Sequence, residues 1–175
     1  NNLDKECNHL VHLQGYGIPK IITYGRSGLY NVLIQELLGP DLFEIVKNSG
    51  KALTIKDICM VGIQILERIE YIHNKSYIHR DIKPHNFLIG LDNPNLLYLI
   101  DFGLAKKYRS QRGNHVKYSI GHEITGTPRF CSLNAMKGIE LSRRDDLESI
   151  SYLIAYFAKG TLPWQGLKET NKEKR

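Results

Sequence analysis

An apolar stripe in residues 58–72 requires this part of the chain to fold as a helix that packs on a core. The stripe consists of residues three and four positions apart: Ile58, Val61, Ile65, Ile69 and Ile72. Residues with this spacing share one face of an α-helix. Thr54 can cap the helix through its hydroxyl, and Asp57 follows three residues later, where a carboxylate faces the positive end of the helix dipole.

A second strong helix is predicted from about Asp146 to Lys159, ending at Gly160. Its apolar residues leave little polar face, so we expect this helix to be deeply buried. They are Leu147, Ile150, Leu153, Ile154 and Phe157. Weaker helical spacing predicts another helix over residues 3–13, stopped by the glycines and the proline of residues 15–19.

Short apolar runs between turn residues predict two hairpins. The first has strands at residues 20–24 and 29–37 with a turn at 25–28, and Gly39-Pro40 ends its second strand. Asp41 then lies where it can cap a short helix over residues 42–47. The second hairpin has strands at residues 87–89 and 96–100, joined by a turn at 90–95.

Composition narrows the class of protein. A chain of 175 residues, 42% hydrophobic and 24% charged, is typical of one globular domain and excludes a disordered, collagen-like or coiled-coil protein. The longest apolar run, residues 152–158, is far shorter than the roughly 20 residues of a membrane-spanning helix. The 3 cysteines are far apart and form no Cys-x-x-Cys pair, which argues against a disulfide framework and a zinc site. They favour a reducing compartment, the cytoplasm or the nucleus.

The net charge of +6 is spread among acidic residues rather than concentrated in one block. Phosphate groups, acidic proteins and nucleic acids all remain possible partners on charge alone. A nucleic-acid-binding domain is the weakest of these interpretations, because no concentrated basic face lined by aromatic residues can be traced. We therefore expect no nucleic-acid partner.

The residues that carry chemistry lie in two loops that flank predicted strands. One is His79-Arg80-Asp81-Ile82-Lys83-Pro84-His85-Asn86, and the other is Asp101-Phe102-Gly103. A carboxylate, an ammonium and an amide in the first loop, with a second carboxylate in the other, suit a magnesium-nucleotide site. Asn86 and Asp101 would supply the oxygen ligands that Mg²⁺ prefers. The alternative, two unrelated polar turns, requires both motifs to occur in this order by chance.

These two loops resemble the catalytic loop and the metal-binding loop of eukaryotic protein kinases. Further segments resemble the casein kinase 1 family, and the likeness extends from about Glu6 to the C-terminus. The segments are residues 37–42, 83–88, 101–108, 125–127, 138–149 and 162–166. The resemblance implies an α+β, protein-kinase-like fold with a mainly helical C-terminal lobe and a remnant of the β-rich N-terminal lobe. Residues 1–38 would be the end of the N-terminal lobe and the hinge, and residues 39–175 the C-terminal lobe.

The resemblance implies an ATP-dependent protein serine/threonine kinase of the casein kinase 1 type, with ATP and Mg²⁺ as cofactors. Asp81 would accept the proton of the substrate hydroxyl, and Lys83 would neutralise the γ-phosphoryl oxygens. Asp101 would bind the Mg²⁺ between the β- and γ-phosphates, and Asn86 would hold a second ion. The hydroxyl of Thr127 would reach back towards Asp81 and Lys83.

Four residues would have structural roles in such a site. His79 would be buried, and Arg80 would meet backbone or an acidic partner. Asp146 would hydrogen-bond the backbone around residues 79–80 and hold the loop still. Glu6 matches the helix glutamate that pairs with a strand lysine in kinases, although taken alone it reads equally as solvated surface.

The resemblance places ATP at residues 34–38, which match the kinase hinge. Backbone groups of Glu36 and Leu38 would pair with the adenine edge, and Gln35 would be the gatekeeper. Family members often carry an apolar residue at the Gln35 position, so the shape of the back pocket is expected to differ. The other expected contacts of the nucleotide are Asp41 and Glu44 at the ribose, and Leu88 and Ile100 under the adenine. For each apolar residue, core packing is an equally good interpretation.

Two departures from the family pattern stand out. Ser132-Leu133-Asn134 replaces the usual Ala-Pro-Glu, as it does in the casein kinase 1 family. No Gly-x-Gly-x-x-Gly and no Val-Ala-x-Lys occurs before Glu6, so we expect the chain to be an incomplete kinase domain, cut short at both ends. We also expect it to be poorly soluble in isolation, because residues 146–159 would lose apolar neighbours.

The resemblance also implies that the substrates are acidic or phosphorylated proteins, and we expect the protein to be a monomer. Arg129, together with Lys172, Lys174 or Arg175, could form a pocket for an anion three positions before the target serine. A solvated helix face over residues 168–175 is an equally good interpretation. The main rival to an enzyme is a non-catalytic binding module with a kinase-like surface. Retention of Asp81, Lys83, Asn86 and Asp101 favours the enzyme.

Overall fold

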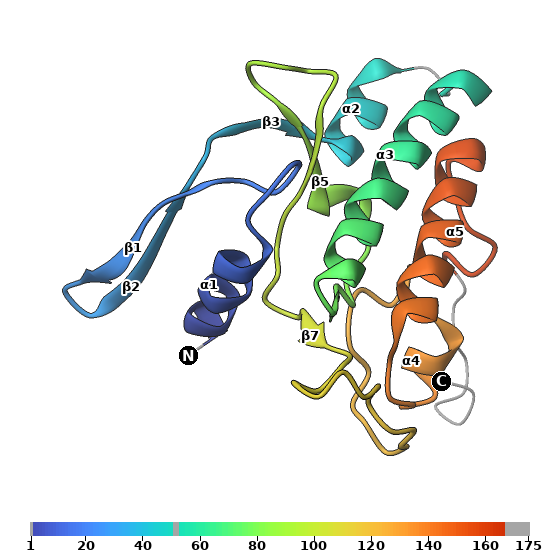
Figure 1. The fold of residues 1–175 in the computed structure, drawn as a ribbon. Helices are drawn as coiled ribbons and strands as arrows, with labels where there is room; N and C mark the ends of the chain where they lie inside the picture. The colour runs from blue at the N-terminus through green and yellow to red at the C-terminus, as the bar shows by residue number, and fades with distance from the viewer. Residues whose placement is uncertain (1, 51–52, 167–175) are drawn as a thin grey trace.

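The two long helices that the sequence predicts are both present in the computed structural model, which describes residues 2–50 and 53–166. Helix α3 spans Ile55–Asn74 and helix α5 spans Arg143–Lys159, and they pack side by side (Figure 1). The predicted cap of α3 is confirmed: Thr54 Oγ1 accepts a hydrogen bond from Asp57 N at 3.2 Å, and Asp57 Oδ2 accepts one from Thr54 N at 3.0 Å.

Helix α5 differs from its prediction at its start and in its burial. It begins three residues before Asp146 because Ser142 and Asp145 form a capping box of their own. Its interior face is buried at Ile150, Leu153 and Phe157. The expectation of deep burial is wrong for the helix as a whole, since Leu147 is 48% exposed. The predicted end is confirmed, because Gly160 follows the last turn at φ 73°, a conformation that glycine adopts without strain.

The N-terminal part consists of helix α1, Asn2–Leu13, and a hairpin of strands β1, Ile21–Ser27, and β2, Tyr30–Gln35. Leu10 and Leu13 of α1 are fully buried, and α1 packs on the hairpin, which projects away from α3 and α5 (Figure 1). The predicted helix and hairpin are therefore confirmed, but the turn lies at residues 28–29 instead of 25–28. The β1–β2 register also shifts between Ile21 and Thr23, at the end of the hairpin away from the turn.

The prediction that Gly39-Pro40 ends the second strand of the hairpin is wrong. These two residues lie inside a separate strand. Strand β3, Leu38–Asp41, pairs antiparallel with β5, Phe87–Gly90, which pairs with β6, Leu97–Leu99. β3 is an edge strand of this sheet, where proline costs no ladder hydrogen bond. Helix α2, Leu42–Ser49, follows directly, and Asp41 Oδ1 caps it by accepting from Glu44 N at 2.7 Å, as predicted.

Four short elements lie next to the loops that carry the candidate site residues. They are β4, Tyr77–Ile78; the 3₁₀ helix η1, Pro84–Asn86; β7, Lys106–Lys107; and α4, Leu133–Met136. β4 pairs antiparallel with β7, which brings the loop after β4 next to the segment that contains Asp101. Within the two described ranges, none of the helices combines the length and the apolar character that crossing a membrane requires.

Candidate active site

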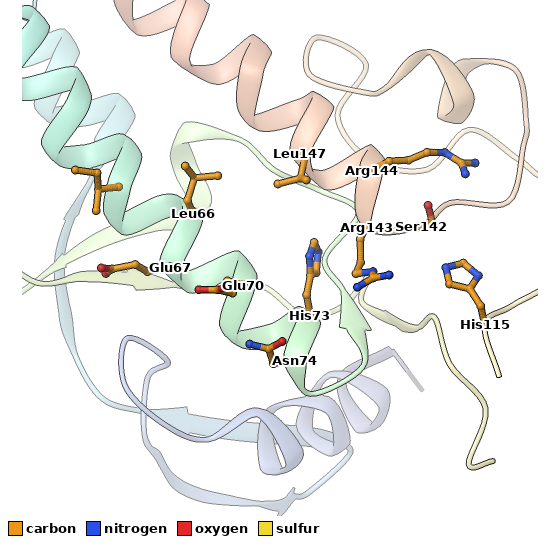
Figure 2. A pocket seen from close by; sticks show the side chains of 11 residues that line it. Leu66, Glu67, Glu70, His73, Asn74, His115, Ser142, Arg143, Arg144 and Leu147 are labelled. Carbon is orange, nitrogen blue, oxygen red and sulfur yellow. The ribbon is translucent and has the colours of Figure 1, made fainter. Parts of the chain in front are cut away.

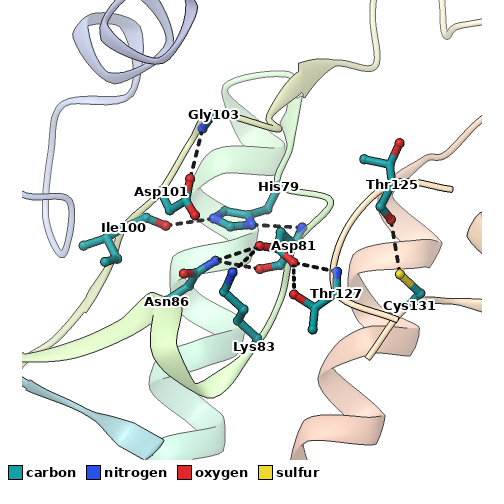
Figure 3. A network of polar contacts seen from close by, with 10 residues as sticks. All are labelled: His79, Asp81, Lys83, Asn86, Ile100, Asp101, Gly103, Thr125, Thr127 and Cys131. Carbon is teal, nitrogen blue, oxygen red and sulfur yellow. Dashed lines mark hydrogen bonds and ion pairs between the residues drawn. The ribbon is translucent and has the colours of Figure 1, made fainter. Parts of the chain in front are cut away.

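Three loops come together around Asp81, a residue that is only 5% exposed (Figure 3). Asp81 lies between β4 and η1, Asp101 follows β6, and Thr127 belongs to the loop before α4. Thr127 lies 46 residues from Asp81 along the chain, yet it donates two hydrogen bonds to Asp81 Oδ1, from its backbone N at 2.8 Å and its Oγ1 at 2.7 Å. The fold thus brings together residues that the sequence connects only by motif.

The second oxygen of Asp81 is held from within its own loop. Lys83 Nζ donates to Asp81 Oδ2 at 2.6 Å, and Asn86 Nδ2 donates to the Asp81 backbone carbonyl at 2.8 Å. Burial alone would raise the pKa of Asp81, but hydrogen bonds from Lys83 and Thr127 and the charge of Lys83 outweigh it and hold this pKa below its ordinary value. Asp81 is therefore a fixed, ionised acceptor at neutral pH.

Asp146 fixes the backbone beside Asp81 from helix α5. Its Oδ2 accepts from His79 N and its Oδ1 from Arg80 N, both at 2.9 Å, which are the hydrogen bonds that the sequence predicts. Arg80 has a left-handed φ of 71°, a conformation that costs about 1–3 kcal/mol in a non-glycine residue and persists only when its surroundings enforce it. Arg80 Nε also donates to Leu104 O at 2.6 Å, so the residue is held at both ends.

His79 and Gly126 complete the support of the loop. His79 is fully buried, as predicted, with Nε2 3.0 Å from Ile100 O. Gly126 passes so close to Arg80 that a Cβ at this position would lie 2.4 Å from Arg80 O, and its φ of 95° also requires glycine. Next to it, Cys131 Sγ donates to Thr125 O at 3.2 Å, and burial, with the nearby charge of Asp81, raises the pKa of this thiol to about 11.

Asn86 and Asp101 fit a magnesium site. The Asn86 side-chain nitrogen is committed to Asp81, which leaves its oxygen as the free end of the amide, and Asp101 Oδ1 has one weak contact, from Gly103 N at 3.4 Å. Mg²⁺ commonly takes one or two protein oxygens and completes its shell with water and substrate phosphates. In the part of the chain that the structure describes, no cluster of three or more His, Cys, Asp or Glu residues could hold a metal ion without such help.

The predicted adenine and ribose contacts lie along β2, β3, α2 and β5. Gln35 ends β2 and Leu38 begins β3, so Glu36 lies in the link between these strands. Asp41 faces Leu88 across the β3–β5 ladder, which places a predicted ribose contact beside a predicted adenine contact. The remaining two are Glu44, exposed on α2, and Ile100, half-buried after β6. Asp41 is already the cap of α2 through one carboxylate oxygen.

The sequence allowed two interpretations of Glu6, a helix glutamate that pairs with a cation or a solvated surface residue, and the structure contradicts the second. It is half-buried on α1, and a Cβ on Gly103 would lie 3.8 Å from its Oε2. Burial raises the pKa of Glu6, the negative charge of Asp101 raises it further, and a hydrogen bond from the Phe102 backbone lowers it. Helix α1 therefore points a carboxylate at the Asp101 loop, where a cation could lie between the two acids.

The loop that carries Thr127 is anchored on α5 by the residues that replace Ala-Pro-Glu. Ser132 Oγ and Asn134 Nδ2 both donate to Asp145 Oδ1 at 2.9 Å. Arg129 lies in the same loop with an exposed side chain. Lys172, Lys174 and Arg175, its expected partners in an anion pocket, lie outside the described residues.

The structure also contains links that the sequence does not reveal. His73 Nε2 lies 2.8 Å from Asp146 Oδ2, so α3 shares the support of the Asp81 loop. Glu140 Oε1 and Oε2 accept from Lys106 Nζ at 2.8 Å, beside His122. Trp164 Nε1 donates to Arg129 O at 2.9 Å. Each joins residues more than 30 positions apart with no shared motif, so neither periodicity nor spacing could have identified them.

A large hollow of the described chain lies away from Asp81. It is a groove of about 850 Å³ between α3 and the start of α5, with Leu66 and Leu147 in its wall and His73 at its edge (Figure 2). His73 connects it to the Asp81 loop, through Asp146. The polar network of Figure 3, not this groove, is the candidate site.

A comparison with protein families identifies the family to which this arrangement belongs. The family model described as protein kinase domain matches residues 1–175, the whole of the sequence.

Proposed function

The chain belongs to the protein kinase family, and we propose that it transfers the γ-phosphoryl group of ATP to serine or threonine in proteins, as a kinase of the casein kinase 1 type. One observation carries this proposal: Lys83 and Thr127 converge on the buried carboxylate of Asp81, while Asn86 bonds the Asp81 backbone carbonyl. A non-catalytic binding module would not need a carboxylate that is buried, ionised and held at both oxygens.

Asp81 orients the attacking hydroxyl and takes its proton as the new O–P bond forms. Because the transition state of phosphoryl transfer is loose, positioning and charge neutralisation supply most of the rate enhancement. A lowered pKa suits this role, since a carboxylate that stays ionised always presents an acceptor. Lys83 Nζ lies 2.6 Å from Asp81 Oδ2. When ATP binds, Lys83 would exchange this contact for the γ-phosphoryl oxygens.

Asn86 and Asp101 would hold magnesium, which supplies neutralisation of the phosphate charge when bound. Asp101 has a left-handed φ of 63°, and Gly103 N lies 3.4 Å from its Oδ1. Glu6 faces the same loop and is placed to pair with a cationic group there. For the nucleotide we propose Glu36, Leu38, Leu88 and Ile100 at the base and Asp41 and Glu44 at the ribose.

The finer assignments rest on the resemblance and on the Arg129 loop. Ser132 and Asn134, the residues typical of the casein kinase 1 type, tie this loop to Asp145. Arg129 presents an exposed guanidinium two residues after Thr127, which supports acidic or phosphorylated substrates. We further propose a monomer in the cytoplasm or nucleus.

The test is Asp81→Asn in the full-length protein. The amide keeps the shape of the side chain but cannot take a proton, so transfer of ³²P from ATP to a serine peptide is expected to fall by about 100-fold or more. ATP binding, measured by calorimetry, is expected to stay within about twofold. Asp92→Asn makes the same change at an exposed carboxylate in the turn between β5 and β6 and should leave transfer unchanged.

Two results would contradict the proposal. Undiminished transfer by Asp81→Asn would remove Asp81 from the reaction. Absence of transfer in the unmodified protein, with partner binding intact, would favour the binding module.

A further inference from the structure

The backbone of Arg129 is held in place, and its side chain is exposed. The turn of residues 127–131 is closed by hydrogen bonds from Phe130 N and Cys131 N to Thr127 O, at 2.9 and 3.1 Å. Arg129 therefore has a fixed place relative to Thr127, which bonds Asp81. Among residues 2–50 and 53–166, the Arg129 guanidinium has no hydrogen bond, ion pair or ring contact, so it is available to a substrate anion.

Trp164 closes the other side of this turn. Its Nε1–H donates to Arg129 O at 2.9 Å, 35 residues away along the chain. The indole packs edge-on against the Tyr152 ring of α5, with centroids 4.9 Å apart. The long helix thus fixes the plane of the indole, and the indole fixes the Arg129 carbonyl.

Glu148 extends the support to the end of the loop. Tyr152 Oη donates to Glu148 Oε1 at 2.7 Å, and the same oxygen accepts from Leu133 N at 2.7 Å. One face of α5 therefore holds Arg129 through Tyr152 and Trp164, and Leu133 through Glu148. The segment between them is clamped at both ends.

We propose that Trp164 is a positioning residue for substrate selection, which acts through Arg129 to aim its guanidinium at an anion upstream of the phosphorylated serine. This rests on the proposed function, and it names a determinant outside the two loops that carry Asp81 and Asp101. Trp164 does not contact the reacting atoms. Its loss should weaken the binding of acidic or phosphorylated substrates and leave the transfer step unaffected.

The experiment uses Trp164→Phe, which keeps a ring against Tyr152 but removes the N–H donor. Two serine peptides are compared in the full-length protein, one with phosphoserine three positions before the target and one with alanine there. We expect KM for the phosphopeptide to rise about two- to tenfold, as the loss of one hydrogen bond allows, with kcat unchanged and the alanine peptide unaffected. Thermal unfolding of the variant, measured alongside, should match the unmodified protein within about 2 °C.

Arg129→Gln provides the control for the route of action. It removes the charge but keeps the carbonyl that Trp164 bonds. If Trp164 acts through Arg129, then Trp164→Phe in the Arg129→Gln background should produce no further rise in KM, because the anion contact is already absent. An additive effect, or an equal loss on both peptides, would show a general structural role and overturn the proposal.

The outcomes separate this inference from the proposed function. If the unmodified protein transfers phosphate but turns over both peptides equally, the proposed substrate class fails and the role of Trp164 fails with it. If the unmodified protein prefers the phosphopeptide and Trp164→Phe retains that preference in full, only the role of Trp164 is wrong.

Discussion

At the scale of single residues, the state of Asp81 depends on donors from two loops. Lys83 and Thr127 each bond one of its oxygens, and together they overcome the cost of burying the charge. Thr127 is the informative partner to change, because Lys83 also has a proposed role at the phosphate. Its hydroxyl and its backbone N–H bond the same oxygen, so the hydroxyl can be removed alone.

We predict that Thr127→Val lowers kcat by about tenfold, since a hydrogen bond to a charged group contributes about 1.5–3 kcal/mol. The pH dependence should also change. Removing a donor to the carboxylate raises the pKa of Asp81 from its lowered value. Asp81 is then protonated, and activity is lost, at a higher pH than in the unmodified protein. The acidic limb of the kcat/KM profile should therefore move to higher pH.

Thr127→Ser is the matched control, because it keeps the hydroxyl and should keep both the rate and the position of the acidic limb. A Thr127→Val profile with its acidic limb at the original pH would show that this hydroxyl does not set the pKa of Asp81.

At the scale of elements, Asp146 ties helix α5 to helix α3 and to the Asp81 loop. It accepts from His73 at 2.8 Å and from the backbone of His79 and Arg80, both at 2.9 Å. Its side chain is almost fully buried, so each of these groups would lose a partner that water cannot replace.

We predict that Asp146→Asn lowers the free energy of unfolding by about 2–3 kcal/mol, because an amide nitrogen then faces a donor where an oxygen accepted before. Activity should fall as well, since the loop that carries Asp81 loses its anchor. Urea denaturation measures the first effect, and faster hydrogen exchange at the His79 and Arg80 amides would report the second. Asp57→Asn, at the exposed cap of α3, should leave exchange at these two amides unchanged.

The elements that the sequence predicted correctly are those whose signals are local. The α3 stripe, its cap at Thr54 and the cap at Asp41 need only neighbouring residues, and all three are confirmed. β3 was missed because its stability comes from pairing with β5, which lies far along the chain and permits Pro40 at an edge. Likewise, the grouping of Asp81, Lys83 and Asn86 follows from a short motif, whereas the contact of Trp164 with Arg129 depends on tertiary packing.

At the scale of the whole molecule, α3 and α5 leave several apolar side chains exposed among charged ones on the faces that turn away from the core. Ile63 is 59% exposed, Leu66 45% and Leu147 48%, and all three line the groove between the helices. Figure 2 shows Leu66 and Leu147 in its wall. Glu67 and Arg144 lie on the rim with opposite charges, which gives little electrostatic repulsion between copies. Contiguous apolar surface of this kind favours association.

We predict that the 175-residue chain self-associates in isolation and that Leu66→Gln with Leu147→Gln raises its monomeric fraction. Because both side chains are about half exposed, their replacement forfeits little buried apolar area, so the melting temperature should change by less than about 3 °C. Light scattering during size-exclusion chromatography measures the monomeric fraction. Leu153→Gln makes the same chemical change at a fully buried position of α5 and should instead unfold or aggregate the chain, because it places an amide in the core. A monodisperse, cooperatively melting preparation of the unmodified chain would show that this apolar face does not limit its solubility.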